Sequence, residues 1–502
     1  GVQRPVSQAR ADVAETRLAT IAAAPGGTEP GLSGFRLLPV GDQAFDARIA
    51  LARRAEKTLD VQYYLIAADG TGLLFLRELR DAAARGVRVR VMVDDLHGAG
   101  QDALYAGLAA HPNVEVRLWN PLPVRSGSFG SRLVRSVHEF SRINRRMHNK
   151  LFIADNVFAV TGGRNMADEY FDRSEPANFI DMDMLASGPV VPELSEVFDL
   201  YWNSEHAYPV QSLVGPRLDL ADARRAFDAA VQGVAAAVLP AERDSLGQRS
   251  VEAQLASGVG AGHFAAARVL ADAPSKADAA STDPDDRSEG TVTTGSFDLI
   301  GSARADVLVA SPYFIPGQRG LDVMRAAVAK NVRVSVMTNS LSTTDAPLVH
   351  FVYARYRTAL LKMGVALYEL MPLAGHEAQA RRSESAFDFA GSLGRLHAKL
   401  AVVDERYLFI GSMNMDRRSA RWNTEIGLVI DSPELAGEVT RLLQRDRLPS
   451  SYRLRLAGDT DRIEWVANTG GNEVVRKTEP DSTAVRQLRL WLTSRFVAED
   501  LL

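Results

Sequence analysis

Two segments of the chain carry a histidine and a lysine at the same spacing. The first, MHNKLFIADNVFAVTGGRN, contains His148 and Lys150, and the second, LHAKLAVVDERYLFIGSMN, contains His397 and Lys399. In both segments an aspartate follows the lysine by five residues, a glycine follows the aspartate by seven, and an asparagine follows that glycine by three. One histidine–lysine pair is weak evidence for a site, but two copies with identical spacing predict a shared chemical role.

The residue types indicate chemistry at a phosphodiester. A neutral histidine can attack phosphorus, and a second histidine can protonate the leaving alkoxide. Two lysines, together with Asn165 and Asn414, would offset the negative charge and stabilise the pentacoordinate oxyanion. One copy of the motif supplies half of this set, so both copies are expected to meet at one site. Such a double displacement requires no metal and no cofactor.

The surroundings of both motifs, KLFIAD and KLAVVD, are typical of strands. Alternation along a strand places each histidine and the lysine two residues later on one face. Asp155 and Asp404 have the opposite parity and stand at predicted hairpin turns, so we interpret them as structural supports. In each second strand Gly163 or Ser412 follows a glycine, and the close backbone approach there suits binding of an anionic oxygen.

Elements that would position the motifs occur twice. Residues 45–66 predict a helix and the strand VQYYLI, after which LLFLRELRDAAARG predicts a helix and VRVRVMVDD a strand. Residues 297–340 repeat this order, which predicts two α/β lobes, each with a mainly parallel mixed sheet flanked by helices. We expect an N-terminal helical segment at 1–34, lobes at 35–215 and 293–450, an Ala-rich helical connector with a polar loop at 216–292, and an extension at 451–502.

Composition excludes several classes of protein. The 502 residues include no cysteine, which excludes disulfides and thiol chemistry. The formal net charge is −4, so no nucleic-acid partner is expected. We expect no transmembrane helix, because no apolar run is long enough. Asp94, Asp95 and His97 form an incomplete metal set, and the histidines outside the motifs follow no ligand spacing, so no metal is expected. These histidines are His111, His138, His206, His263, His350 and His376.

The duplicated motif resembles that of the phospholipase D superfamily, H-x-K-x4-D followed by Gly-Ser-x-Asn, over residues 35–210 and 293–445. VQYYL, Asp94-Asp95, RRMHNK, GGRN, SPYFIPG and NTEIG are similar to bacterial cardiolipin synthases, and FSRINRRMHNK with GGRNMADEYF to their C type. The resemblance implies two lobes related by a pseudo-twofold axis, with His148 as the nucleophile and His397 as acid and base. It also implies transfer of a phosphatidyl group to phosphatidylglycerol, with phosphatidylethanolamine as the donor.

Family members support each catalytic histidine with a downstream acid. Glu425 lies 28 residues after His397 and is expected to support it, and alignment assigns Asp181 to the first half, with Asp183 as an alternative. The first motif departs from the family pattern, because Gly163-Arg164 stands where a serine and a variable residue are usual. The resemblance therefore leaves Ser412 as the additional phosphate ligand.

Two further features have open interpretations. Tyr63 and Tyr64, like Tyr313 and Phe314, lie toward the ends of strands, where they either flank the lipid headgroup or pack in the core. Segment 131–146 spaces Arg132, Arg135, Arg142, Arg145 and Arg146 among apolar residues. It is either a basic amphipathic helix on anionic lipid or a solvated helix face.

Three other functions compete with phosphatidyl transfer. They are hydrolysis to phosphatidic acid, a nuclease activity of the same superfamily, and a scaffold with an inactive site. The intact histidine–lysine pairs argue against the scaffold. We therefore expect phospholipid substrates and peripheral contact with an anionic bacterial membrane; the membrane face and the oligomeric state stay open.

Overall fold

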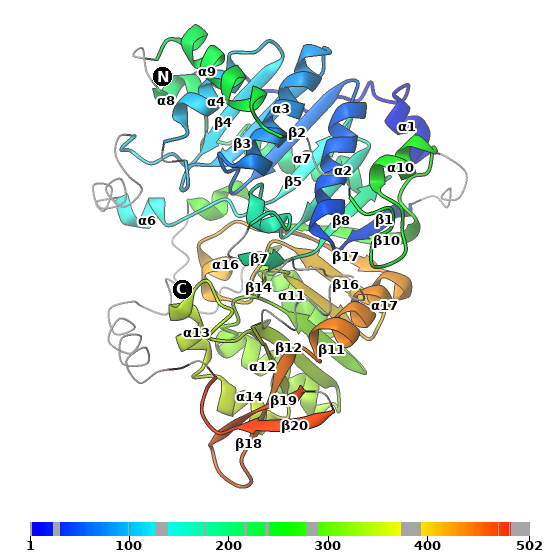
Figure 1. Cartoon of the computed structure of the whole chain (residues 1–502), viewed down its shortest axis with the longest axis vertical. Helices are drawn as coiled ribbons and strands as arrows, with labels where there is room; N and C mark the ends of the chain where they lie inside the picture. The colour runs from blue at the N-terminus through cyan, green and yellow to red at the C-terminus, as the bar shows by residue number, and fades with distance from the viewer. Residues whose placement is uncertain are drawn as a thin grey trace.

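The computed structural model describes residues 3–23, 31–98, 100–125, 139–174, 177–214, 218–235, 240–278, 290–372, 393–469, 471–480 and 482. Two α/β lobes are stacked along the long axis of the molecule, the N-terminal lobe above the C-terminal one (Figure 1). Helices cover the sheet in both lobes. The two predicted α/β lobes are confirmed.

The first lobe follows the predicted alternation of helices and strands. Its strands are β1 (Ser33–Leu38), β2 (Thr58–Tyr63), β3 (Arg88–Asp94), β4 (Val114–Trp119), β5 (Leu151–Ala154), β6 (Phe158–Gly162), β7 (Ala177–Ile180), β8 (Asp183–Ser187) and β9 (Ala207–Pro209). Its helices are α1 (Arg17–Ala22), α2 (Gly41–Arg54), α3 (Gly70–Ala84), α4 (Asp102–Ala109), α6 (Phe140–Ile143), η2 (Asp168–Tyr170), α7 (Val190–Trp202), α8 (Val210–Val214), α9 (Leu220–Gln232) and α10 (Val251–Ala256).

The second lobe repeats this plan and adds strands at its end. Its strands are β10 (His263–Ala271), β11 (Asp306–Ala310), β12 (Arg333–Asn339), β13 (Ala366–Leu370), β14 (Leu393–Leu396), β15 (Leu400–Val403), β16 (Tyr407–Gly411), β17 (Ile426–Asp431), β18 (Ser451–Leu456), β19 (Ile463–Thr469) and β20 (Asn472–Arg476). Its helices are η3 (Pro274–Ala277), α11 (Val292–Gly301), α12 (Gly317–Ala329), α13 (Pro347–Tyr353), α14 (Arg357–Met363), α16 (Arg417–Arg421), α17 (Pro433–Leu442) and the π-helix η5 (Leu443–Arg447).

One sheet runs through both lobes. Its strand order is β9-β4-β3-β2-β5-β6-β8-β1-β10-β17-β16-β15-β11-β12-β13-β18-β19-β20. Within this sheet the parallel pairs are those joined by crossover helices, β2-β3-β4 and β11-β12-β13. Hairpins and the strands at the lobe junction pair antiparallel, so the sheet is less parallel than the helix–strand alternation alone predicts.

The junction between the lobes corrects one expectation. The connector at 216–292 was expected to be helical, but its residues His263–Ala271 form strand β10. Residues 263–265 of β10 pair with β1, and residues 266–271 pair with β17. β1 likewise pairs with two strands, with β10 through residues 33–35 and with β8 through residues 34–38. Pairing on both sides overrides the helix propensity of the alanines in HFAAARVLA. β1 and β10 are therefore equivalent strands that meet where the halves join.

The core also crosses the junction. One apolar cluster contains Phe35, Leu37 and Met147 from the first lobe, together with Leu396 and Ile426 from the second. All five side chains are buried. The lobes therefore share a core, which fixes their relative position. None of the described helices combines the length and the apolar character that crossing a bilayer requires.

Two tight hairpins carry the motif strands. Asp155 and Asn156 join β5 to β6 with φ of 51° and 52°, and Asp404 and Glu405 join β15 to β16 with φ of 55° and 49°. Positive φ at two successive turn residues is the pattern of a type I′ hairpin. Each turn aspartate accepts hydrogen bonds from three successive backbone N–H groups, at 56–58 and at 304–306. The aspartates thus fasten the hairpins to the segments that begin β2 and β11.

Candidate active site

The two motif histidines are attached to the opposite lobe through their backbones. The N–H of His148, just before β5, donates to the carbonyl of Thr424 at 2.9 Å. The N–H of His397, just before β15, donates to the carbonyl of Ile180 at 2.7 Å. β14, which leads into the second motif, pairs in parallel with β7 of the first lobe, and the two strands lie side by side at the lobe junction (Figure 1). Both motifs are therefore built into the junction.

Because of this attachment, each histidine is supported by an acid of the opposite lobe. Nδ1 of His148 lies 2.9 Å from Oε2 of Glu425, and Nδ1 of His397 lies 2.6 Å from Oδ2 of Asp181. The expectation that Glu425 supports His397 and that Asp181 supports His148 is wrong. Each acid follows the residue whose carbonyl receives the histidine of the other lobe, so its side chain reaches that histidine. The alternative acid, Asp183, forms ion pairs with Arg48 and Arg164 instead.

The acids fix the state of the two imidazoles. An ionised carboxylate at Nδ1 accepts a hydrogen bond from an N–H at that nitrogen, which leaves Nε2 as the basic nitrogen. Burial lowers the pKa of His148 to about 4, with Lys150 and Lys399 adding to the effect against Glu425. Burial likewise lowers the pKa of His397. Both histidines are therefore neutral near pH 7 in the free enzyme, as a nucleophile or a base requires.

The acids themselves stay ionised. Burial opposes the charge of Asp181, but His397, Lys399 and Arg164 outweigh it and lower the pKa of this carboxyl to about 2. Burial likewise opposes the charge of Glu425, but His148, Lys150 and the Ser412 hydroxyl together outweigh it, so the pKa of Glu425 is also lowered.

The two motif lysines are buried amines. Lys150 and Lys399 are 1% and 2% exposed, and each Nζ donates to the carbonyl of the histidine two residues earlier, at 2.7 Å and 2.5 Å. Burial, together with the charge of Lys399, lowers the pKa of Lys150 to about 7, and burial lowers the pKa of Lys399 to about 8. Neither amine forms an ion pair with a carboxylate of the described residues. An anion placed between them would favour their charged forms.

Both motif asparagines have buried polar atoms to offer. The Oδ1 atoms of Asn165 and Asn414 are buried without a hydrogen bond among the described residues. The Nδ2 of Asn165 lies 3.0 Å from the hydroxyl of Tyr170. Rotating this amide by 180° lets Oδ1 accept from Tyr170 and turns the N–H groups the other way, and the two orientations are alternatives of one side chain. An amide N–H is then available for an anionic oxygen.

Gly163 and Ser412 support the acids in different ways. A Cβ added at Gly163 would lie 2.1 Å from Oδ1 of Asp181, so the absence of a side chain makes room for this carboxylate. The hydroxyl of Ser412 donates to Oε2 of Glu425 at 2.5 Å and accepts from the N–H of Ile426 at 3.0 Å. Ser412 was expected to bind phosphate directly; its hydroxyl is instead engaged with the acid that holds His148. Both positions therefore act through an acid.

Aromatic side chains surround the histidines, but Tyr63 is not among them. Tyr63 is 0% exposed and its hydroxyl accepts from Nε of Arg48 at 2.8 Å, so it is a core residue. The neighbouring Tyr64 packs edge-on against His148, with ring centroids 5.1 Å apart. Neighbouring side chains at the end of β2 point in opposite directions. The sequence alone therefore could not show which of the two tyrosines faces the site.

The second histidine has its own aromatic neighbours. Tyr170 and Phe179 lie against His397 with ring centroids 5.1 Å and 4.8 Å away. Tyr313, a predicted substrate contact, donates its hydroxyl to Asp345 at 2.7 Å. Sequence analysis missed Tyr170 and Phe179; their only signal is their place in the GGRNMADEYF segment and in the strand before Asp181.

The remaining predicted features have structural roles. Asp94 forms an ion pair with Arg146 at 3.1 Å, and Asp95 pairs with Arg125, so the Asp94–His97 loop supports the fold. Arg145 and Arg146 are 6% and 0% exposed, which contradicts a lipid-facing basic helix over this part of segment 131–146. Residues 131–138 of that segment, including Arg132 and Arg135, lie outside the described residues.

Comparisons with known proteins agree with this geometry. The family described as "Cardiolipin synthase, PLD-like domain" matches residues 49–202 and 297–447, one stretch in each lobe. Cardiolipin synthase C of Escherichia coli is 35% identical over 94% of this chain and 97% of its own length. Cardiolipin synthase A of Pseudomonas fluorescens is 26% identical over 82% of this chain and 68% of its own length.

Among solved structures, phosphatidylserine synthase of Haemophilus influenzae superposes with a TM-score of 0.58 at 14% identity, covering 92% of each chain. This likeness shows that the fold is shared. The family match covers more than half of the chain, and it falls on the two repeats that carry the histidine–lysine motifs. The chain is therefore a member of the phospholipase D-like family of cardiolipin synthase domains.

Proposed function

We infer that this protein is a phospholipase D-type phosphatidyltransferase that forms cardiolipin from phosphatidylglycerol and a second phospholipid. The observation that carries the proposal is the crossed pair of histidines, each held at Nδ1 by an acid of the other lobe. Two such imidazoles beside two lysines match the needs of a two-step displacement at phosphorus. The name of the E. coli relative, cardiolipin synthase C, supports the choice of product.

In the first step Nε2 of His148 attacks the phosphorus of the donor lipid. A P–N bond forms, the P–O bond to the headgroup alcohol breaks, and a protonated His397 gives its proton to the leaving oxygen. Binding of the anionic phosphodiester favours that protonation, because it brings a negative charge to the site. Lys150 and Lys399 offset the charge on the phosphoryl oxygens. The product is a phosphatidyl group on His148.

In the second step the roles of His397 reverse. Its neutral Nε2 removes the proton from a hydroxyl of phosphatidylglycerol, and the oxygen attacks phosphorus while the P–N bond breaks. Cardiolipin leaves, His148 returns to its neutral form, and His397 is again protonated for the next cycle. Transfer to water in place of this hydroxyl would give phosphatidic acid. Phosphatidylethanolamine is our proposed donor, on the resemblance to the C type.

Substrate access implies contact with a lipid surface. Both proposed substrates are bilayer lipids. We therefore propose that the enzyme works at the surface of the bacterial membrane.

The proposal is tested with vesicles that contain phosphatidylethanolamine and phosphatidylglycerol, each labelled separately. Wild-type protein should produce doubly labelled cardiolipin and free ethanolamine. His148→Ala and His397→Ala should each abolish this product, whereas His111→Ala should not, because His111 pairs with Asp228 away from the motifs. Phosphatidic acid without cardiolipin would identify a hydrolase. DNA cleavage without lipid turnover would identify a nuclease and refute the proposal.

A further inference from the structure

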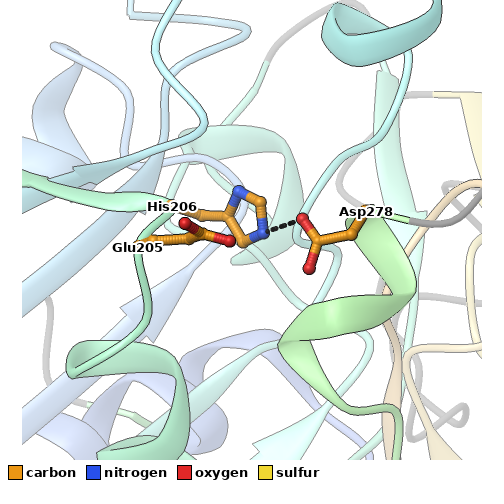
Figure 2. Close-up of side chains that lie close together, drawn as sticks. All are labelled: Glu205, His206 and Asp278. Atoms are coloured by element: carbon orange, nitrogen blue, oxygen red, sulfur yellow. Dashed lines mark ion pairs between the residues drawn. The ribbon is translucent and has the colours of Figure 1, made fainter.

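Outside the active site, the fold brings together three ligand-type side chains from distant parts of the sequence. Glu205 and His206 lie in the loop between α7 and β9, and Asp278 follows η3. Their ligand atoms, one imidazole nitrogen and two carboxylate oxygens, all lie within 4.8 Å of one another. Figure 2 shows the three side chains converging from two separate segments. No short sequence spacing could have indicated this group.

The geometry of the imidazole suggests a shared ligand rather than a simple ion pair. Nε2 of His206 lies 2.9 Å from Oδ1 of Asp278. This nitrogen is buried, yet it forms no hydrogen bond with any described residue, so the contact lacks the alignment of an N–H···O bond. The imidazole nitrogen and the carboxylate oxygen therefore lie close together while the nitrogen keeps its lone pair or N–H available for another partner.

Both segments are held in place independently of any ligand. The carbonyl of His206 accepts the N–H of Asn120 at 2.8 Å, and its ring packs against Trp119 with centroids 5.2 Å apart. The N–H of Asp278 donates to the carbonyl of Ser275 at 2.9 Å, which continues η3. The half-buried imidazole of His206 and the backbone of Asp278 are therefore held in place, whereas the carboxylates of Glu205 and Asp278 are exposed and can adjust to an ion.

The ligand types select a class of metal. Imidazole and carboxylate ligands suit Zn²⁺ and similar transition-metal ions, whereas Mg²⁺ and Ca²⁺ prefer oxygen ligands alone. Zn–N and Zn–O bonds of about 2.0–2.2 Å in a tetrahedron place neighbouring ligand atoms about 3.3–3.6 Å apart. A small rotation of Glu205 and a slight opening of the His206–Asp278 contact would reach these separations. A water molecule would then occupy the fourth position.

A second group of this kind is already neutralised by the protein. His350, Glu369 and Glu479 also place ligand atoms within 4.8 Å, but Arg357 contacts Glu369 at 2.7 Å and Glu479 at 2.6 Å. At the first group, the charge of Asp278 acts on Arg145, but Arg145 donates to the carbonyl of Ala277 at 2.6 Å. Among the described residues no ion pair joins a guanidinium to Glu205 or Asp278.

We propose that Glu205, His206 and Asp278 bind Zn²⁺ and thereby fasten η3 to the first lobe. η3 leads toward the active site: its Lys276 donates to Asp272 at 2.8 Å, and Asp272 accepts the backbone N–H of Glu425 at 3.0 Å. The ion would therefore stabilise the segment that carries the support of His148. This site lies apart from the reacting atoms and has a structural role.

The test measures Zn²⁺ binding by metal-free, full-length protein from which any histidine tag has been removed. In equilibrium dialysis, wild-type protein should bind one equivalent more than His206→Gln or Asp278→Asn, in the presence of excess Mg²⁺. His263→Gln is the matched control, because His263 pairs with Glu438 at 3.0 Å and the described residues place no third ligand there. Zn²⁺ should raise the melting temperature of wild type and control, but not of the two site variants.

Replacement of Zn²⁺ by Co²⁺ adds a spectroscopic readout. A four-coordinate site with one imidazole gives strong visible absorption, which the His206→Gln and Asp278→Asn proteins should lack. Equal melting temperatures of all the metal-free proteins would show that the variants fold. Equal Zn²⁺ stoichiometry in wild type and His206→Gln, or an equal loss in the His263→Gln control, would overturn the proposal.

Discussion

Replacing Glu425 with glutamine removes a negative charge that stabilises one step in particular, the attack of His148 on phosphorus. Glu425 is 0% exposed, and its carboxylate lies 2.9 Å from Nδ1 of His148. When Nε2 attacks phosphorus, the imidazole becomes cationic and gains the attraction of this carboxylate. In addition, the amide of glutamine can donate to Nδ1, which moves the remaining proton to Nε2 and removes the nucleophile.

The size of the effect follows from the distance. For charge centres about 4 Å apart and an effective dielectric constant of about 20, the attraction is about 4 kcal/mol. At about 1.4 kcal/mol per factor of ten, this loss slows formation of the covalent intermediate about 10³-fold. Loss of tautomer control adds to it, and removal of the orienting carboxylate in serine proteases costs about 10⁴-fold. We therefore expect a reduction of about 10³- to 10⁴-fold.

The assay separates the two histidines through the leaving group. A phosphatidyl ester of p-nitrophenol releases a stable anion, so formation of the covalent intermediate from it needs little help from a general acid. Burst release of p-nitrophenol should therefore be nearly lost in Glu425→Gln but retained within about tenfold in Asp181→Asn, whereas both variants fail with natural lipid. Glu405→Gln, at an exposed turn, is the control for replacing an acid.

The opposite pattern would refute the assignment of roles. If Asp181→Asn abolished the burst and Glu425→Gln retained it, His397 would be the nucleophile. If neither variant slowed turnover by more than about tenfold, the crossed contacts would not matter for catalysis, and the electrostatic reasoning above would be wrong.

Three further predictions concern the same machinery. Gly163→Ser introduces the residue that the family usually has, yet it should reduce turnover as strongly as Asp181→Asn, because its Cβ would lie 2.1 Å from the Asp181 carboxylate. Steady-state kinetics with lipid vesicles would measure this loss, and wild-type activity would contradict the prediction. The pKa values of about 7 for Lys150 and about 8 for Lys399 mean that both amines lose their charge as pH rises through this range. Inhibition by tungstate should therefore weaken as the pH rises from about 6 to about 9, a range in which the charge of tungstate itself is constant. An inhibition constant that does not change with pH would argue against the lowered pKa values of the two lysines. Asp155→Ala leaves three backbone N–H groups without their acceptor and should lower the free energy of unfolding by about 2–4 kcal/mol, measured by urea denaturation, whereas an unchanged midpoint would rule out the supporting role.

The sequence predicted the parts of the site that depend on local spacing. His148 and Lys150 are fixed by a two-residue interval on a strand, and Asp155 by a tight turn, so their local geometry can be anticipated from the motif alone. The two lobes were also predictable, because the helix–strand alternation occurs twice. In each of these cases the information lies within a few neighbouring residues.

What the sequence could not show depends on contacts between distant segments. The exchange of Glu425 and Asp181 between the histidines requires knowing that Thr424 and Ile180 receive the backbone N–H groups of the opposite motifs. β10 was read as helix because its alanines favour a helix in isolation, and only pairing with β1 and β17 makes it a strand.

The crossed acids also bear on why the two halves differ. The acid that holds His148 is itself held by a hydroxyl, since Ser412 donates to Glu425 at 2.5 Å. The acid that holds His397 fills the space above Gly163 and takes its hydrogen bond from the N–H of Met182 at 2.8 Å. Because each lobe supplies the acid for the other histidine, neither lobe contains a complete catalytic unit.

A change in one half therefore alters the histidine of the other half. This coupling would allow the two repeats to take the proposed roles of nucleophile and acid–base group while each keeps its histidine and lysine. The substitution of glycine for serine in the first motif is then not a loss of function. It is the change that gives Asp181 its place beside His397, and it ties the difference in roles to a difference in packing.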